Sequence, residues 1–571
     1  MRVLLTAINS KYIHTGLGVR YVGEYAKSQG HQVQLLEETI NTQILDVLEK
    51  IMAAKVDVYG FSVHIWNKPF VMRLIAMLRK LRPEATIVVG GPEVAFAAER
   101  IFAEQPAIDY IVQGEGEICF SELLRALEQH EAIPQHIAYK VGDEVRLNGG
   151  TTVMEDLSVL PFPYPDLEQV LAEHKIVYYE ATRGCPFSCA YCLSGISRTV
   201  RKRPLPMVLA DLDRFIAAGA PLVKFVDRTY NLDENYFLPM MQHLAAAKTN
   251  ATFHFEIKAD ILTEQVLEFL ATVPKGRFQL EIGIQSTHQP TLKAINRRDN
   301  WERLAANVRR LLAMGNMHIH VDLIAGLPYE DLATFGKSFD DAYGLKAHML
   351  QLGFLKVLPG TQMEKETVEH GLRYMDEPPY EILATKYMPY EDMQFLKRVE
   401  NVLDQTGNSG SFGYILPALM KAEGLKPFAF YRALTNWWVE KGYYPQTHNV
   451  KGVAEILAQY IKENFGEDAT MLLEILRYDV FLAVPGWRPD WLAWQSEHIF
   501  DKVSAFWRNE EVAKQYVPSY EFSSWRQINK NYPIELFRYH WEDGRAGEFY
   551  VLLDNSGEVN KIVELPCLAN K

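Results

Sequence analysis

Three cysteines lie within one short stretch of this sequence, Cys185, Cys189 and Cys192, with a C-x3-C-x2-C spacing. Thiolates are soft ligands, and several in one loop suit an iron–sulfur cluster. Three of them can hold three irons of a [4Fe–4S] cube and leave the fourth iron open to a small molecule. Zinc would instead require a fourth Cys or His nearby, and the next candidates are His243 and Cys567. The spacing therefore favours a cluster over a zinc knuckle.

This loop, with Tyr191 directly before its last cysteine, resembles the radical S-adenosylmethionine (SAM) superfamily. The resemblance implies that the open iron chelates the amino and carboxylate groups of SAM. It also implies that the reduced cluster cleaves SAM to a 5′-deoxyadenosyl radical, which requires an electron donor such as flavodoxin or ferredoxin. Such an oxygen-sensitive cluster suits a reducing, cytoplasmic location.

Six strand–helix units surround and follow this loop, and they predict a partial (β/α)6 barrel like that of radical SAM enzymes. Barrels of parallel strands bind their ligands at the carboxyl ends of the strands, so the loops there should carry the chemistry. The predicted strands are Ile176–Ala181, Pro221–Val226, Thr252–Lys258, Arg277–Ile284, His318–Ile324 and His348–Val357.

Several residues at these strand ends match the groups that SAM presents. Glu281 and Gln285 resemble the pair that binds the ribose in the family. Lys258 stands where relatives often have arginine, and lysine keeps the charge but loses the two-point fork that binds a carboxylate. Backbone at Ile324 and Gly326, and at the tyrosine of the cysteine loop, is expected beside the adenine. Each polar residue of this set could instead form an ion pair inside the barrel.

Ahead of the barrel, strands alternate with helices, which predicts a parallel, doubly wound sheet. Glycines follow its strand ends, where backbone can approach a ligand closely. The Gly-x-Gly-x-x-Gly of a dinucleotide-binding domain is missing after the first strand. The predicted strands are Arg2–Asn9, His31–Glu37, Val56–Val63, Thr86–Val89 and Tyr110–Val112.

Three segments of this region, Phe61–Val63, Val89–Glu93 and Gly114–Glu117, resemble the cobalamin-binding domain that precedes the radical domain in one class of radical SAM enzymes. The domain order also matches that class. The resemblance implies a Rossmann-like domain and a bound cobalamin. The contacts carried over from these segments are Ser62, Gly90, Gly91, Pro92, Glu93, Gly114 and Glu115.

The chain departs from many cobalamin proteins at the lower axial face of cobalt. It lacks Asp-x-His-x-x-Gly, and the corresponding segment is Asn9–Gly16. Imidazole is a good ligand for late first-row metals, so His14 and His64 are candidates. Trp66 could cover that face without ligating cobalt, and either histidine could be an ordinary loop residue.

The predicted elements and a proline-rich connector divide the chain into four parts. We predict a cobalamin-binding Rossmann-like domain over residues 1–135 and a linker over 136–175, where the proline-rich Leu160–Pro165 is extended. The radical SAM barrel follows over 176–370. Residues 371–571 hold eight of the ten tryptophans and predict a mainly helical domain with a terminal β-hairpin, of unknown role.

The bulk properties describe an ordinary globular α/β protein. The 571 residues carry a formal net charge of −13, which argues against a broad nucleic-acid-binding surface. No apolar run reaches the roughly 18 residues of a membrane helix, and the first residues do not resemble a signal peptide. The partners expected are a small-molecule or peptide substrate and the electron donor.

The resemblance implies methylation of an unactivated carbon, with one SAM supplying methylcobalamin and a second supplying the radical. Radical cyclisation, rearrangement or oxidoreduction with the same cofactors remains an alternative, as does a non-catalytic cobalamin or SAM sensor. Methylthiolation of tRNA would need a second cysteine set in the N-terminal domain, where only Cys119 is present.

Overall fold

The computed structural model describes residues 1–142, 144–195, 197–495, 499–556 and 561–569. The chain forms two compact units, Met1–Met393 and Gln394–Lys571. Within the described residues, no helix is both long and apolar enough to cross a bilayer.

A seven-stranded sheet forms the start of the first unit, with the strand order β2-β1-β3-β4-β5-β6-β7. The first five strands in this order pair in parallel, and the last two add an antiparallel hairpin at the edge. This hairpin lies within the stretch that we expected to be a linker. The strands are β1 Arg2–Asn9, β2 Gln32–Thr39, β3 Val58–Ser62, β4 Thr86–Gly90, β5 Tyr110–Val112, β6 Ile137–Val141 and β7 Glu144–Asn148.

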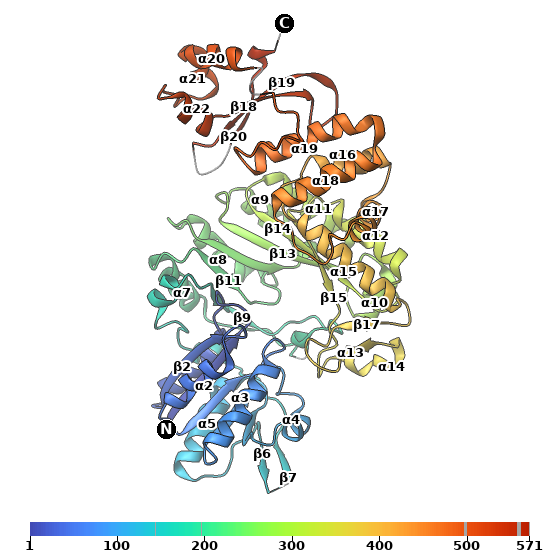
Figure 1. Cartoon of the computed structure of the whole chain (residues 1–571). Coiled ribbons are helices and arrows are strands. Elements are labelled where there is room, and N and C mark those ends of the chain that lie inside the picture. Colours follow the sequence, from blue (N-terminus) through green and yellow to red (C-terminus); the bar gives the residue numbers. More distant parts are fainter. Residues whose placement is uncertain (143, 196, 496–498, 557–560, 570–571) are drawn as a thin grey trace. The chain divides into compact units, whose positions relative to one another are not determined.

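Helices cover both faces of this sheet (blue to cyan in Figure 1), as the predicted doubly wound fold requires. Helices α1 (Leu17–Ser28) and α5 (Gly116–Gln129) pack over one face, with Leu5 and Leu123 in the shared core. The opposite face packs Ile8 and its neighbours against α2 Ile44–Ala53, α3 Lys68–Leu81 and α4 Ala98–Glu104. Burial on both faces explains the nearly unbroken apolar run of β1.

Six parallel strands form the second sheet, in the order β8-β11-β12-β13-β14-β15, which confirms the predicted six-unit barrel. They run through the green and yellow part of Figure 1. The strands are β8 Val177–Tyr179, β11 Leu222–Phe225, β12 Thr252–Ile257, β13 Phe278–Gln285, β14 His318–Ala325 and β15 Met349–Phe354. The helices between them are α7 Leu205–Ala217, α8 Glu234–Ala246, α9 Glu264–Ala271, α10 Gln289–Ala294, α11 Trp301–Met314 and α12 Leu332–Tyr343.

The side chains of β13 and β14 alternate between the two faces of this sheet. Leu280 and Ile282 are fully buried in the apolar layer, whereas Glu281 on the same strand is not. On β14, Val321 and Leu323 are buried in the same way and flank Asp322. Because successive side chains of a strand point to opposite faces, the polar residues of both strands line the barrel interior.

Short elements complete the first unit around these two sheets. They are α6 Leu167–Ala172, β9 Thr182–Arg183, β10 Arg201–Lys202, α13 Gln362–Lys365, α14 Thr367–His370, β16 Arg373–Tyr374 and β17 Ile382–Ala384. Helix α15 (Tyr390–Gln405) leads into the second unit.

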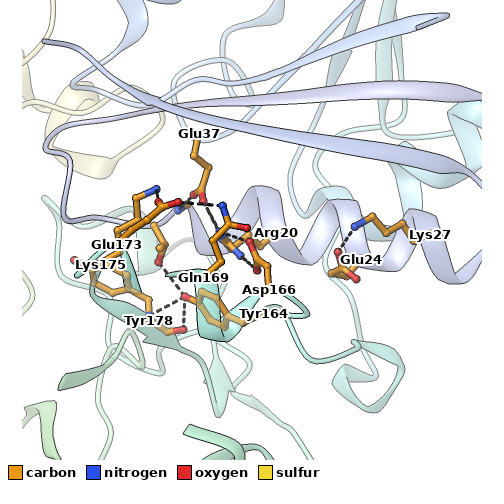
Figure 2. Close-up of polar contacts among 12 residues, drawn as sticks. Arg20, Glu24, Lys27, Glu37, Tyr164, Asp166, Gln169, Glu173, Lys175 and Tyr178 are labelled. Carbon is orange, nitrogen blue, oxygen red and sulfur yellow. Dashed lines mark hydrogen bonds and ion pairs between the residues drawn. The ribbon is translucent and has the colours of Figure 1, made fainter. Parts of the chain in front are cut away.

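The segment between the two sheets is held to the N-terminal sheet by a buried arginine (Figure 2). Arg20 on α1 forms ion pairs with Glu37 on β2 and with Asp166 ahead of α6. The Tyr164 hydroxyl binds the main chain of Tyr178 on β8. It donates a hydrogen bond to the Tyr178 carbonyl and accepts one from the Tyr178 amide. These contacts fix where the first barrel strand starts relative to the N-terminal sheet.

Replacing Arg20 with methionine is expected to destabilise this part of the first unit by about 3–5 kcal/mol, because Glu37 is left as a buried charge without its arginine. Hydrogen exchange of the α1 and β2 amides in the apo-protein measures the loss. Lys27 is the matched control, since it lies on the same helix and pairs with Glu24 at the surface. Lys27→Met should cost less than about 1 kcal/mol. Equal losses in the two variants would contradict the role given to Arg20.

The second unit is mainly helical, as expected, and its terminal strands form a three-stranded sheet, one strand more than the predicted hairpin. Buried Trp438 and Trp507 belong to the interior, which is the ordinary role for tryptophan. Arg477 is fully buried between Glu474 and Glu535. The elements are α16 Ile415–Glu423, α17 Pro427–Glu440, α18 Val450–Asn464, α19 Ala469–Ala483, α20 Phe500–Arg508, α21 Glu510–Tyr516, α22 Trp525–Asn531, β18 Ile534–Tyr539, β19 Ala546–Asp554 and β20 Lys561–Glu564.

Candidate active site

The cysteine loop begins at the carboxyl end of β8, and hydrogen bonds to its backbone hold it there. The buried carboxylate of Asp227, just after β11, accepts hydrogen bonds from the amides of Ala181 and Thr182 and from the Thr182 hydroxyl. Farther along, the amide of Ala190 donates to the carbonyl of Ile295, and the carbonyl of Ala190 accepts from the amide of Met363 in α13. The loop is therefore held by segments from several parts of the barrel.

A glycine is required immediately before the first cysteine. Gly184 has a φ of +99°, and a Cβ at this position would overlap the carbonyl oxygen of Thr199. The amide of Cys185 donates to the carbonyl of Ser197, 3.1 Å away. Close packing of these two backbone segments places the first cysteine, and a side chain at residue 184 would force them apart.

A cavity of about 230 Å³ is lined by Cys185, Cys189 and Cys192 together with the ends of β12, β13 and β14. Burial raises the pKa of Cys189, and the charges of the other two thiols add to this while Arg297 opposes it. No three metal-binding side chains among the described residues meet at one point, as a single ion would require. A cube places its three thiolates on three different irons, so this donor set fits a [4Fe–4S] cluster.

Four of the predicted SAM residues line this cavity, namely Tyr191, Lys258, Glu281 and Gln285. Ile324 and Gly326 are not among the residues that line it. The Lys258 ammonium binds the carboxylates of Asp260 and Asp299, so two anions already neutralise its charge. These two partners, of which Asp299 is 41 residues away in the chain, weaken the predicted role of Lys258 toward the SAM carboxylate.

Gln285 has a backbone conformation that is rare for a residue with a side chain. Its φ is +69°, and the pairing of β13 with β14 shifts register between Gly283 and Gln285. Its Oε1 atom is buried without a hydrogen-bond partner among the described residues. A strained backbone that holds an unsatisfied acceptor against a cavity is typical of a ligand site.

Further polar residues line the cavity and were missed by our sequence analysis; the charged ones are Arg228, Glu256, Arg297, Arg298 and Asp322. Arg297 binds Asp299 and the carbonyl of Gly283, whereas the Arg298 side chain has no hydrogen bond or ion pair among the described residues. Arg298 is therefore a better candidate than Lys258 for an incoming carboxylate. The consecutive arginines were the available signal, but they follow helix α10 and no strand end.

Asp322 is a buried carboxyl on the cavity wall, and burial raises its pKa to about 8, with Glu281 and Glu256 adding to the shift. Its Oδ1 has no partner in the described part of the chain. The folded-state pKa lies above the unfolded value, so the stability that this group contributes is complete below about pH 4. That contribution is lost as the pH rises toward 8.

Asp322→Asn should therefore flatten the pH dependence of stability. We expect the free energy of unfolding of the apo-protein to fall between pH 5 and pH 8 by less in the variant than in the wild type. The largest difference in slope is about 1.4 kcal/mol per pH unit. Urea unfolding at both pH values measures it, and parallel profiles for the two proteins would contradict the assignment.

The larger cavity, of about 600 Å³, lies between the strand ends of the N-terminal sheet and the start of the barrel. Glu93 is the one predicted cobalamin contact that does not line it. The Glu93 carboxylate is instead buried and accepts a hydrogen bond from Tyr380. The predicted residues that do line the cavity are His14, Ser62, His64, Trp66, Gly90, Gly91, Pro92, Gly114 and Glu115.

Gly91 shows why a glycine follows β4. Its φ is +110°, and a Cβ there would lie 2.5 Å from the carbonyl oxygen of Val63. The loops after β3 and β4 can therefore pack backbone against backbone. This leaves a smooth wall on the cavity, which suits the face of a large ring.

The two candidate histidines differ in their freedom to ligate a metal. His64 is stacked on Trp66 with ring centroids 4.4 Å apart, its Nε2 lies 3.0 Å from the Ser62 hydroxyl, and burial lowers its pKa to about 4. His14 binds the Tyr178 hydroxyl through Nδ1 at 2.6 Å. No described residue bonds to the Nε2 atom of His14. Of the two, His14 is the better candidate ligand for cobalt.

A largely buried arginine joins the N-terminal sheet to the cysteine loop. Arg183, two residues before the first cysteine, forms ion pairs with Glu117 at 2.8 Å, Glu180 at 2.8 Å and Glu115 at 3.4 Å. Glu115 also binds Arg201. Glu115 thus has a structural role in addition to its position on the cavity wall.

Models of known families match three separate segments of the chain. Residues 3–124 match the B12 binding domain, residues 179–342 match the radical SAM superfamily, and residues 368–552 match a family described as a protein of unknown function (DUF4080). The match to the B12 binding domain includes the larger cavity's glycine loops. The radical SAM match includes the cysteine loop.

Two relatives illustrate the range of named activities. The cobalamin-dependent radical SAM methyltransferase TokK of Streptomyces tokunonensis is 24% identical over 351 residues, which are 57% of this chain and 50% of that protein. An anaerobic magnesium-protoporphyrin IX monomethyl ester cyclase of Synechocystis sp. is 25% identical over 294 residues, 49% of this chain and 58% of the cyclase. The matched region spans about half the length of these relatives.

Solved structures share the fold. The cobalamin-dependent SAM radical enzyme OxsB, solved with aqua-cobalamin and SAM, has a TM-score of 0.60 at 16% identity and covers 89% of this chain and 81% of its own. The radical SAM methyltransferase TsrM of Kitasatospora setae, solved with cobalamin and a [4Fe–4S] cluster, has a TM-score of 0.57 at 16% identity. Its match covers 66% of this chain and 82% of its own.

Proposed function

We propose that this chain, which belongs to the cobalamin-dependent radical SAM enzymes, methylates an unactivated carbon of a small molecule. The observation that carries the proposal is the arrangement of the two cavities. Each opens at the carboxyl ends of a parallel sheet, and both are lined by Arg228. A substrate at this junction can face both cofactors at once.

The residues present fit the cofactors that the two domains imply. Cys185, Cys189 and Cys192 would hold the cluster, and Glu281 and Gln285 would receive the SAM ribose. Arg298 would meet the SAM carboxylate. The glycine-edged wall of the larger cavity would receive cobalamin. When bound, the cluster supplies an electron for SAM cleavage and cobalamin supplies a transferable methyl group, while the protein positions both and excludes water.

The names of similar proteins support methylation, since TokK and TsrM are both called methyltransferases. The test is an anaerobic reaction of the reconstituted enzyme with substrate and SAM that carries a deuterated methyl group. We expect 5′-deoxyadenosine and S-adenosylhomocysteine in equal amounts, and the deuterated methyl group in the product. Deoxyadenosine without S-adenosylhomocysteine would refute methyl transfer.

Radical cyclisation or rearrangement is the second candidate, because a named cyclase matches this chain at about the same identity as the methyltransferase TokK, although over a shorter stretch. The same reaction separates the two functions, since a cyclase would consume SAM without releasing its methyl group into the product. A one-electron donor such as flavodoxin or ferredoxin would serve either chemistry.

Methylthiolation has less support from the chain itself, although a putative methylthiotransferase of Methanocaldococcus jannaschii is 25% identical over 301 residues. The one N-terminal cysteine, Cys119, is buried in the core between α5 and the sheet, and burial raises its pKa to about 11. Such a thiol suits packing better than the binding of a second cluster.

A further inference from the structure

Arg228 occupies the junction of the two cavities. It follows β11, and the preceding residue, Asp227, turns back to hold the cysteine loop. Of the described residues that line either cavity, Arg228 is the one that lines both. Any substrate carbon placed between the two cofactors must lie close to this side chain.

The guanidinium of Arg228 is a charge without a fixed partner. Its side chain is exposed, and it makes no hydrogen bond or ion pair with any described residue. Other basic groups of the site are already paired, Arg183 with three glutamates and Lys258 with two aspartates. Arg298 is also unpaired, but it lines only the smaller of the two cavities.

Filling the two cavities would remove water from Arg228. A guanidinium that loses its hydration is costly unless it meets an anion. Glu256, on the neighbouring strand β12, attracts Arg228 electrostatically without forming an ion pair with it. An anion on the substrate would serve better, because the planar fork of arginine binds a carboxylate or phosphate at two points.

We propose that Arg228 anchors the substrate, and that the substrate carries a carboxylate or phosphate group close to the carbon that reacts. The inference rests on the proposed function only in placing the substrate between the two cofactors. It adds the chemical class of the substrate, a small organic anion, and the residue that recognises it.

Kinetics provide the first test. A small-molecule extract of the source cells is separated on a strong anion exchanger, and each fraction is added to the reconstituted enzyme with SAM. We expect the bound fraction to stimulate deoxyadenosine formation and the unbound fraction not to do so. In Arg228→Gln, half-maximal stimulation should need about 10- to 100-fold more of the bound fraction, as loss of a charged hydrogen bond predicts. Arg228→Lys should recover part of this loss.

Arg309→Gln is the matched control, because Arg309 is an exposed arginine on the outside of α11. It should respond to the fractions as the wild type does. Because an anchor acts on ground state and transition state alike, the Arg228 variants should keep their maximal rate at saturation. An unchanged half-maximal concentration in Arg228→Gln would overturn the proposal, as would stimulation by the neutral fraction alone.

Chemical labelling tests the same claim without activity. The holoenzyme and the protein without cobalamin are treated with phenylglyoxal, which modifies free guanidinium groups, and modification at Arg228 is measured by peptide mass spectrometry. We expect protection by the bound fraction but not by SAM or by cobalamin alone. Protection by SAM or cobalamin alone would assign Arg228 to the SAM carboxylate or the cobalamin phosphate and refute the proposal.

The two proposals can fail separately. A methylated neutral product would retain the proposed function and overturn the anchor. Anion-dependent deoxyadenosine formation without methyl transfer would retain the anchor and overturn methylation.

Discussion

Replacing Cys189 with alanine is expected to abolish SAM cleavage, the largest effect of any single substitution considered for this protein. Cys189, Cys185 and Cys192 line one cavity, and each would bind a different iron of the cube. With two thiolates left, a second iron loses its protein ligand and the cluster is no longer held in one orientation toward SAM. We expect reconstituted protein to lose most of its iron and sulfide, and deoxyadenosine formation to fall to background.

Cys567→Ser is the control, since Cys567 is an exposed cysteine in the second unit. It should bind the same iron and sulfide as the wild type and cleave SAM at the same rate. A full complement of four irons in Cys189→Ala, with normal SAM cleavage, would contradict the assignment of the cluster.

Replacing Arg183 with methionine is expected to destabilise the first unit by about 3–5 kcal/mol and to weaken cobalamin binding. Three carboxylates, Glu115, Glu117 and Glu180, surround its guanidinium, and Arg201 is a second partner for Glu115 alone. Losing one partner of a buried network leaves uncompensated charges, which is costlier than the pair is worth. The carboxylates should then repel one another and displace the loop that follows β5, which carries Glu115.

Two measurements check this expectation. Urea unfolding of the apo-protein reports the loss of stability, and absorbance titration with hydroxocobalamin reports the loss of affinity. Arg146→Met is the control, because Arg146 and Glu144 form an exposed pair on the edge hairpin and should contribute less than about 1 kcal/mol. If Arg183→Met were as stable as Arg146→Met, the network would not be the link between the N-terminal sheet and the cysteine loop.

Local patterns in the sequence were sufficient for the two parallel sheets of the first unit, apart from the edge hairpin of β6 and β7, and together with the family resemblance they indicated the cofactors. Six strand-like runs became the six parallel strands of the barrel, and in β13 and β14 every second residue is buried because only one face of the strand packs in the apolar layer. Gly91 and Gly184 follow strands where only glycine permits the backbone to pack so closely. The cysteine spacing is equally local, since all three ligands belong to one loop.

The roles of individual charged residues depended on partners that no local pattern reveals. Lys258 is neutralised by Asp299, which is 41 residues away in the chain. Glu93 is turned from the larger cavity toward Tyr380, which is 287 residues away. Both were predicted as ligand contacts because their positions in the motifs matched.

What the sequence by itself determined is the chemistry available: a three-thiolate loop, a glycine-edged sheet and a barrel to hold them. Only the tertiary structure decided which charges are already paired and which remain free at the junction of the two cavities. The physical reason is that an ion pair depends on distances of a few ångströms between side chains. Those distances are set by strand register and by the docking of one sheet on another, and the order of residues along the chain does not specify them.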